Sequence, residues 1–259
     1  MKQHEASARG SLPARIVLGL VVAAATAASS AAAEFKVLAP NAAKEAVSAA
    51  LALMESATPC RASVSWTGTE AITRRVSDGE VVDVVVNAAQ NIDRQAREGK
   101  LIEPTRTDFA RSSIGVAVPA SSARPDVSTP EALKSALLAA RTVVVSSGTS
   151  GRHMVEVFGK LGVGDALRAK TKQPPSGAQI ADFLAAGEAE LGFQQVSELL
   201  HAKGVHYLGP IPAELQSYTV YSAALHAGAG NTDCGKELLS ALRSGTVQSV
   251  VRSTGMEPL

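Results

Sequence analysis

The stretch Gly148-Thr149-Ser150-Gly151-Arg152 decides the fold, because it joins an apolar run to a helical pattern through two glycines. The apolar run at 142–146 predicts a strand, and the pattern at 153–161 predicts a helix. The first N–H groups of a helix lack intrahelical partners and carry the positive end of its dipole, and glycine lets a ligand approach them. This unit therefore predicts an anion-binding turn.

Thr67-Gly68-Thr69-Glu70 forms a second turn of similar chemistry. It follows a predicted strand at 61–66 and precedes a predicted helix at 70–77. Each turn belongs to its own strand–helix unit. Two anion-binding turns on separate α/β units predict a ligand cleft between two lobes.

Residues 1–33 have the features of a secretory signal peptide. Lys2, Arg9 and Arg15 accompany an apolar run at 16–28, and the small residues at 31–33 suit a cleavage site. The alternative, an N-terminal membrane anchor, needs roughly 20 apolar residues, and this run is shorter. We expect a mature periplasmic chain that begins near Glu34, does not span the membrane and is a monomer.

The charge and aromatic content exclude several classes of partner. The chain has 25 Lys+Arg and 24 Asp+Glu, and removal of three basic and one acidic leader residues leaves a formal charge of −1. Nucleic acid binding needs a basic face with stacking aromatics, but aromatic residues make up only 3% of the chain. The same scarcity disfavours a sugar ligand. We expect a small, polar, anionic ligand and no nucleic acid.

The two cysteines leave two alternatives open. Cys60 and Cys234 would enter an oxidising compartment after export, where they form either one disulfide or two separate buried thiols. Two cysteines cannot supply the four thiolates of an iron–sulfur cluster. His201 and His206 have no acidic or thiol neighbours that would complete a metal site. We therefore expect neither a metal nor a cofactor.

Beyond the leader, strands and helices alternate, which is typical of a mainly parallel α/β architecture. Thr129 is expected to cap the helix that starts at Pro130. Tyr218 and Tyr221 alternate with apolar residues in a predicted strand at 215–225, which favours hinge or core packing. Other predicted strands lie at 35–39, 81–87, 114–119 and 190–195, and other helices at 42–54, 92–98, 178–186, 196–202 and 232–242.

Four segments resemble the periplasmic molybdate-binding protein family of ABC importers: 35–42 (FKVLAPNA), 83–88 (DVVVNA), 189–195 (AELGFQQ) and 215–224 (LQSYTVYSAA). The likeness extends over nearly all of 34–259. It implies a two-lobed periplasmic binding protein fold, with mainly parallel sheets flanked by helices and a two-strand hinge. Lobe 1 would comprise 34–111 and 218–259, and lobe 2 would comprise 112–217. An ABC permease is the implied partner.

The resemblance also implies that neutral hydroxyl and backbone donors from both lobes hold the anion. Matched by motif position, the lobe 1 donors are Ala42 and Thr69, and the lobe 2 donors are Ser150, Gly177 and Gln195. This sequence departs from the family pattern twice. Ala42 stands where a serine is expected, and Gln195 stands where a tyrosine is expected.

An amide side chain lies at or next to each departure. Asn41 is the neighbour of Ala42, and Gln195 is itself an amide with Gln194 beside it. Amides both donate and accept hydrogen bonds, whereas a metal oxyanion offers only acceptors. Arg152 could form a bidentate pair with a carboxylate, or it could be solvated on the outer helix face. We interpret these residues as suited to a larger ligand with several carboxylates. The predicted ligand-binding residues are Asn41, Ala42, Thr69, Ser150, Arg152, Gly177, Gln194 and Gln195.

An enzyme on the same scaffold is the alternative function. Bacterial aconitate isomerases are similar to this family, and they interconvert trans- and cis-aconitate without a cofactor. An allylic proton shift needs carboxylate anchors and one group that moves a proton. Glu70 and His153 are the candidate catalytic residues, although Glu70 could simply favour its own helix N-terminus and His153 could be structural. The sequence does not identify the anion or exclude either function.

Overall fold

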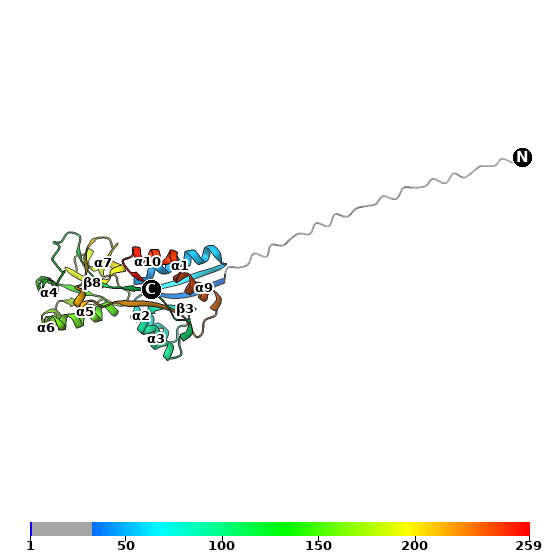
Figure 1. The fold of residues 1–259 in the computed structure, drawn as a ribbon, viewed down its shortest axis with the longest axis horizontal. Helices are drawn as coiled ribbons and strands as arrows, with labels where there is room; N and C mark the ends of the chain where they lie inside the picture. The colour runs from blue at the N-terminus through cyan, green and yellow to red at the C-terminus, as the bar shows by residue number, and fades with distance from the viewer. Residues whose placement is uncertain (2–32) are drawn as a thin grey trace. The chain divides into compact units, whose positions relative to one another are not determined.

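A computed structural model of the chain describes Met1 and residues 33–259, so the predicted leader falls almost entirely outside the described residues. The described chain forms two mixed β-sheets, and each sheet has helices on both faces (Figure 1). No helix in this described part is long and apolar enough to cross a membrane.

The larger sheet has the strand order β11-β4-β10-β3-β1-β2. Three helices pack against one face and two against the other, and a separate apolar core fills each side. The strands are β1 (Ala33–Pro40), β2 (Cys60–Thr67), β3 (Val84–Ala88), β4 (Thr107–Ser112), β10 (Thr219–Leu225) and β11 (Glu257–Pro258). The helices are α1 (Lys44–Ala57), α9 (Thr232–Leu242) and α10 (Gly245–Ser253) on one face, and α2 (Thr69–Ser77) and α3 (Ala89–Arg97) on the other.

The smaller sheet has the order β7-β6-β8-β5-β9 and is also covered on both faces. Its strands are β5 (Ile114–Pro119), β6 (Val143–Val145), β7 (Thr171–Lys172), β8 (Leu191–Gln195) and β9 (Val205–Pro210). The helices α4 (Pro130–Ala139), α5 (Thr149–Lys160) and α6 (Gly164–Arg168) cover one face, and α7 (Ile180–Ala185) and α8 (Val196–Leu199) cover the other. The described residues also form the short 3₁₀ helices η1 (Asn41–Ala43), η2 (Glu103–Thr105) and η3 (Ala213–Leu215).

The two-lobed α/β fold is confirmed, but the sheets are mixed where mainly parallel sheets were expected. β1, β2 and β3 pair in parallel, as do β6, β7 and β8, because helices connect them. Antiparallel pairing occurs at the strands next to the two connections between the sheets. β10 pairs with β3 and β4, and β5 pairs with β8 and β9. The lobe boundaries near residues 111 and 218 stay predictions.

The strand predicted at 215–225 begins later than expected. η3 ends at Leu215, and β10 starts only at Thr219. Between them, the Gln216 side chain accepts from Ile114 N–H at 2.8 Å and donates to Ile114 O at 3.0 Å. This amide therefore bonds the returning chain to the outgoing one, a contact that a hydrophobic pattern does not predict.

Cys60 and Cys234 form a disulfide, which settles the alternatives that the sequence left open. Their Cα atoms are 5.7 Å apart, and both residues are buried. The bridge joins the first residue of β2 to the first turn of α9. It therefore connects the edge strand of the larger sheet to the helix layer that covers it.

Candidate functional site

A small cavity of about 40 Å³ lies between the two sheets. Its lining includes Pro40, Thr67 and Gln195, the last residues of β1, β2 and β8, and Ser146, which follows β6. In open α/β sheets, ligands bind beyond the carboxyl ends of the strands. The cavity is therefore placed where this topology positions a ligand.

Both predicted anion-binding turns reach this cavity. Gly68 is the N-cap of α2 and Gly148 is the N-cap of α5, so neither N-cap residue has a side chain that could cap its helix. The third amide of each helix bonds a serine instead, since Ala71 N–H donates to Ser176 Oγ at 3.1 Å and Gly151 N–H donates to Ser146 Oγ at 3.2 Å. Each glycine lines the cavity together with the threonine that follows it, Thr69 or Thr149. Two helix N-termini that start at glycines and line one cavity favour negative charge there.

Backbone from the two sheets meets closely at Gly68 and Gly177. A Cβ on Gly68 would lie 2.5 Å from the Gly177 nitrogen, and Gly177 has a φ of +94°. Asn41 donates from Nδ2 to Gly177 O at 3.0 Å. Glycine is thus required on both sides of this contact, which closes one wall of the cavity.

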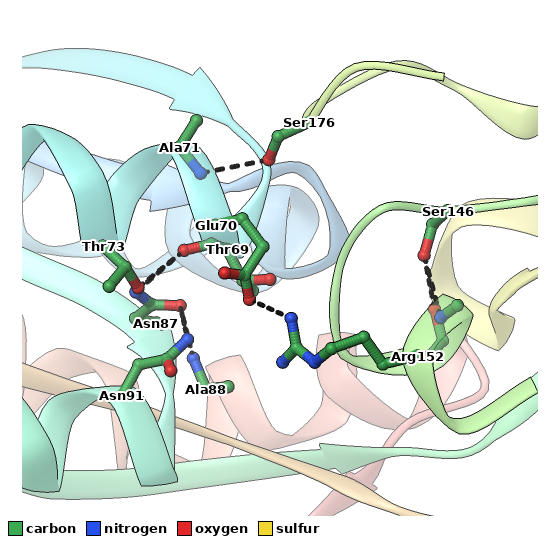
Figure 2. Close-up of polar contacts among 12 residues, drawn as sticks. Thr69, Glu70, Ala71, Thr73, Asn87, Ala88, Asn91, Ser146, Arg152 and Ser176 are labelled. Carbon is green, nitrogen blue, oxygen red and sulfur yellow. Dashed lines mark hydrogen bonds and ion pairs between the residues drawn. The ribbon is translucent and has the colours of Figure 1, made fainter. Parts of the chain in front are cut away.

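Other hydrogen bonds also join the sheets around the cavity. The Ala71 N–H donates to Ser176 Oγ at 3.1 Å, and Ser197 Oγ donates to Ala42 O at 2.8 Å. Figure 2 shows the contact between Ala71 and Ser176 beside the start of α2. These bonds indicate that the structure is a closed form.

Two hydroxyl groups on the cavity lining are buried without a partner. Ser147 Oγ and Thr149 Oγ1 make no hydrogen bond among the described residues, whereas Ser146 Oγ and Ser150 Oγ contact each other at 2.9 Å. An unsatisfied buried hydroxyl costs free energy, so it indicates a missing partner. Ser147 and Thr149 were absent from the predicted site, although the hydroxyl-rich sequence of this turn was a usable signal.

The two glutamines line the cavity, but protein contacts occupy their amides. Gln194 accepts from Ile180 N–H at 3.0 Å and donates to Glu198 Oε1 at 2.8 Å. With its amide oriented to satisfy the network, Gln195 accepts from Thr219 Oγ1 at 2.8 Å and donates to Ser112 Oγ at 3.1 Å. Gln194 therefore holds the start of α7, and Gln195 holds the two connections between the sheets.

Three of the candidate residues lie outside the cavity lining: Arg152, Glu70 and His153. The Arg152 guanidinium on α5 pairs with the Glu70 carboxylate on α2, a contact between the two sheets that Figure 2 shows. His153 Nε2 lies 2.7 Å from Leu215 O, to which it can donate. Each side chain is thus engaged by the protein in this closed form.

The cavity also receives a phenol and a carboxyl that the predicted site did not include. Tyr221 on β10 is buried in the core, as expected, and it also lines the cavity. Glu198 on α8 lines it too, and burial raises the pKa of this carboxyl to about 7. Burial and the nearby Glu198 also raise the pKa of Tyr221 well above its ordinary value. The phenol thus remains a neutral donor.

Seven of the eight predicted ligand-binding residues lie together around the cavity: Asn41, Ala42, Thr69, Ser150, Gly177, Gln194 and Gln195. Arg152 is the exception. That these residues contact a ligand stays a prediction. Within the described part of the chain, no group of three or more His, Cys, Asp or Glu side chains is arranged to hold a metal ion.

Comparisons with protein families, curated proteins and solved structures agree with one another. The family described as bacterial extracellular solute-binding protein matches residues 35–257. An aconitate isomerase from Pseudomonas sp. is 30% identical over 191 residues, which cover 73% of this chain and 72% of that protein.

Solved structures show the same fold at lower sequence identity. The periplasmic molybdate-binding protein of Azotobacter vinelandii is 17% identical, with a TM-score of 0.73 over 86% of this chain and 98% of that one. The sulfate-binding protein SubI of Mycobacterium tuberculosis is 15% identical, with a TM-score of 0.68 over 88% and 87%. These likenesses extend over most of the described chain.

Proposed function

The chain belongs to the bacterial extracellular solute-binding proteins, and on that premise we propose that it captures a small anion in the periplasm for an ABC importer. The observation that carries this proposal is the pair of helix N-termini at one cavity, each of which starts at a glycine, with the unpaired hydroxyls of Ser147 and Thr149 beside them. An anion would accept from these donors in a small cavity partly shielded from water, where such bonds are stronger than in bulk water.

The size of the cavity supports a compact ligand in this closed form. A cavity of about 150 Å³ accommodates benzene, and ligand pockets of drug-sized molecules begin at roughly 300 Å³. The cavity here is about 40 Å³. An anion of a few heavy atoms suits this space, whereas a tricarboxylate would require the two sheets to stand further apart.

Removal of the unpaired hydroxyls tests the proposed function. Ser147→Ala and Thr149→Val are each expected to weaken binding of the preferred anion by about 10- to 100-fold, because a hydrogen bond to a charged group contributes about 1.5–3 kcal/mol. Titration calorimetry with a panel of oxyanions and carboxylates measures this effect. The stability of the unliganded protein should not fall, since these hydroxyls have no protein partner.

Ser249→Ala is the matched control, because this exposed hydroxyl on α10 bonds only its own helix, at Gly245 O. It should bind anions like the wild type. If both cavity variants keep wild-type affinity for every anion that binds, the proposed site is wrong.

Aconitate isomerisation is the second candidate function, favoured by the 30% identical relative and by the carboxyl group of Glu198 on the cavity. A base would remove a proton from the methylene carbon of trans-aconitate. The double bond would shift, and a proton would return to the former vinyl carbon, so no redox cofactor is needed. A carboxyl with a pKa of about 7 suits both steps.

Proton NMR of trans-aconitate in deuterated water distinguishes the two functions. An isomerase would produce cis-aconitate with deuterium in the methylene position. A binding protein would leave the spectrum unchanged, while an anion from the panel raises its melting temperature by mass action.

A further inference from the structure

Glu198 lines both the cavity between the sheets and an outer groove of about 710 Å³. The outer groove is formed by α1 and α10 on one side and by α7 and α8 on the other. Asn41, Ala42 and Glu198 line both spaces. Of these three residues, only Glu198 has a side chain that ionises.

The hydrogen-bond donors to the Glu198 carboxyl are neutral amides. Its Oε1 accepts from Gln194 Nε2 at 2.8 Å and from Gln179 Nε2 at 3.4 Å. Among the described residues, no hydrogen bond to Oε2 and no ion pair to Glu198 is present. Partial burial without a cationic partner raises the pKa of the Glu198 carboxyl, so this environment favours the neutral acid.

Titratable groups from several elements face Glu198. Tyr221 on β10 shares the cavity and carries no charge at neutral pH. The outer groove is lined by charged or titratable side chains of both signs: Lys44 and Glu45 on α1, Asp182 on α7, and His201 and Lys203 after α8. None of them forms an ion pair with Glu198. The groove thus supplies no fixed counter-charge for an ionised Glu198.

We propose that Glu198 makes the cavity select anions that carry a hydrogen-bond donor, such as small hydroxycarboxylates, over oxyanions that have only acceptors. This inference rests on the proposed function and names its substrate class. Ionised Glu198 can accept from a ligand hydroxyl, but it repels a ligand that presents only oxygen acceptors. Protonated Glu198 can donate to either kind of anion. Selectivity therefore increases as the carboxyl ionises.

The pH dependence of binding tests this role, with sulfate and molybdate as acceptor-only probes and glycolate as the hydroxycarboxylate. Sulfate and molybdate should bind with uptake of one proton by Glu198. With a pKa of about 7, their affinity should fall about thirtyfold between pH 6 and pH 8.5. Glycolate affinity should change by about threefold or less. Titration calorimetry at constant ionic strength measures both profiles.

Glu198→Gln should remove the pH dependence for sulfate and molybdate, so that their affinity at pH 8.5 matches that at pH 6. The amide keeps an oxygen that can accept from Gln194. Since folding raises the pKa of Glu198, its ionisation destabilises the folded state. The variant should therefore unfold at the same temperature as the wild type, or higher, at pH 8.5. Glu45→Gln, an exposed carboxyl in the outer groove, is the matched control with a wild-type profile.

The outcomes separate this inference from the proposed function. A pH profile for sulfate that is flat in the wild type, or that persists unchanged in Glu198→Gln, overturns the role of Glu198 and leaves anion capture in place. If no anion of the oxyanion and carboxylate panel binds either protein, both the role of Glu198 and the proposed function are wrong.

Discussion

Replacement of Gly151 by alanine is expected to lower the stability of the protein by about 3 kcal/mol and to weaken anion binding at least about 100-fold. A Cβ at this position would lie 1.5 Å from Ser146 O and 2.6 Å from the Ser146 carbonyl carbon. Both are backbone atoms, so no side-chain rotation relieves the overlap. The turn from Ser146 to Ser150 would have to move, and it carries Ser147 and Thr149 with it.

Gly159→Ala is the matched control for this variant. Gly159 lies in the same helix, α5, but a Cβ there meets no atom within 4 Å. Alanine favours the helix over glycine by up to about 1 kcal/mol, so this variant should be slightly more stable and bind normally. Chemical denaturation and calorimetry measure both properties. Wild-type binding by Gly151→Ala would contradict the role assigned to this turn.

Removal of the disulfide, by the double substitution Cys60→Ala and Cys234→Ala, is expected to lower the free energy of unfolding by about 2–5 kcal/mol. The bridge joins residues 174 positions apart, and a long loop loses much entropy when it is closed in the unfolded chain. Anion affinity should be unchanged, because Cys60 starts β2 and the cavity lies at its other end, roughly 20 Å away.

Reductant provides the control for this prediction. It should destabilise the wild type under conditions that reduce the bridge, and it should leave the double variant unaffected. A double variant as stable as the oxidised wild type would show that the bridge contributes nothing to stability. A loss of anion binding in the folded variant would contradict the separation between bridge and cavity.

Much of the fold was predictable because glycines and apolar runs mark its strand–helix units. The apolar run at 81–87 contains most of β3, and the turn at Gly148 starts α5. Thr129 caps α4, as expected, by accepting from Ala132 N–H at 3.1 Å. β4, β7, β9, β11, α6 and α10 were missed. β9, with the sequence VHYLGP, is only partly buried, so it shows neither a continuous apolar run nor clear alternation.

The sequence predicted the parts of the candidate site that local backbone turns form. It did not predict the parts where side chains from distant elements meet. Thr69 and Ser150 follow from local turn chemistry. The positions of Tyr221 and Glu198 depend on how β10 and α8 pack around the cavity, and no local pattern encodes that packing. For the same reason, the sequence did not indicate that Glu70 and Arg152 would pair with each other.

The bonds from Gln216 to Ile114 have a consequence for how the protein opens. They tie the two connections between the sheets together, so we expect the sheets to separate by rotating as rigid bodies about an axis near this point. The bonds from Asn41, Ala71 and Ser197 across the cavity would then break together. Opening is thus expected to be a concerted, two-state transition rather than a gradual loosening.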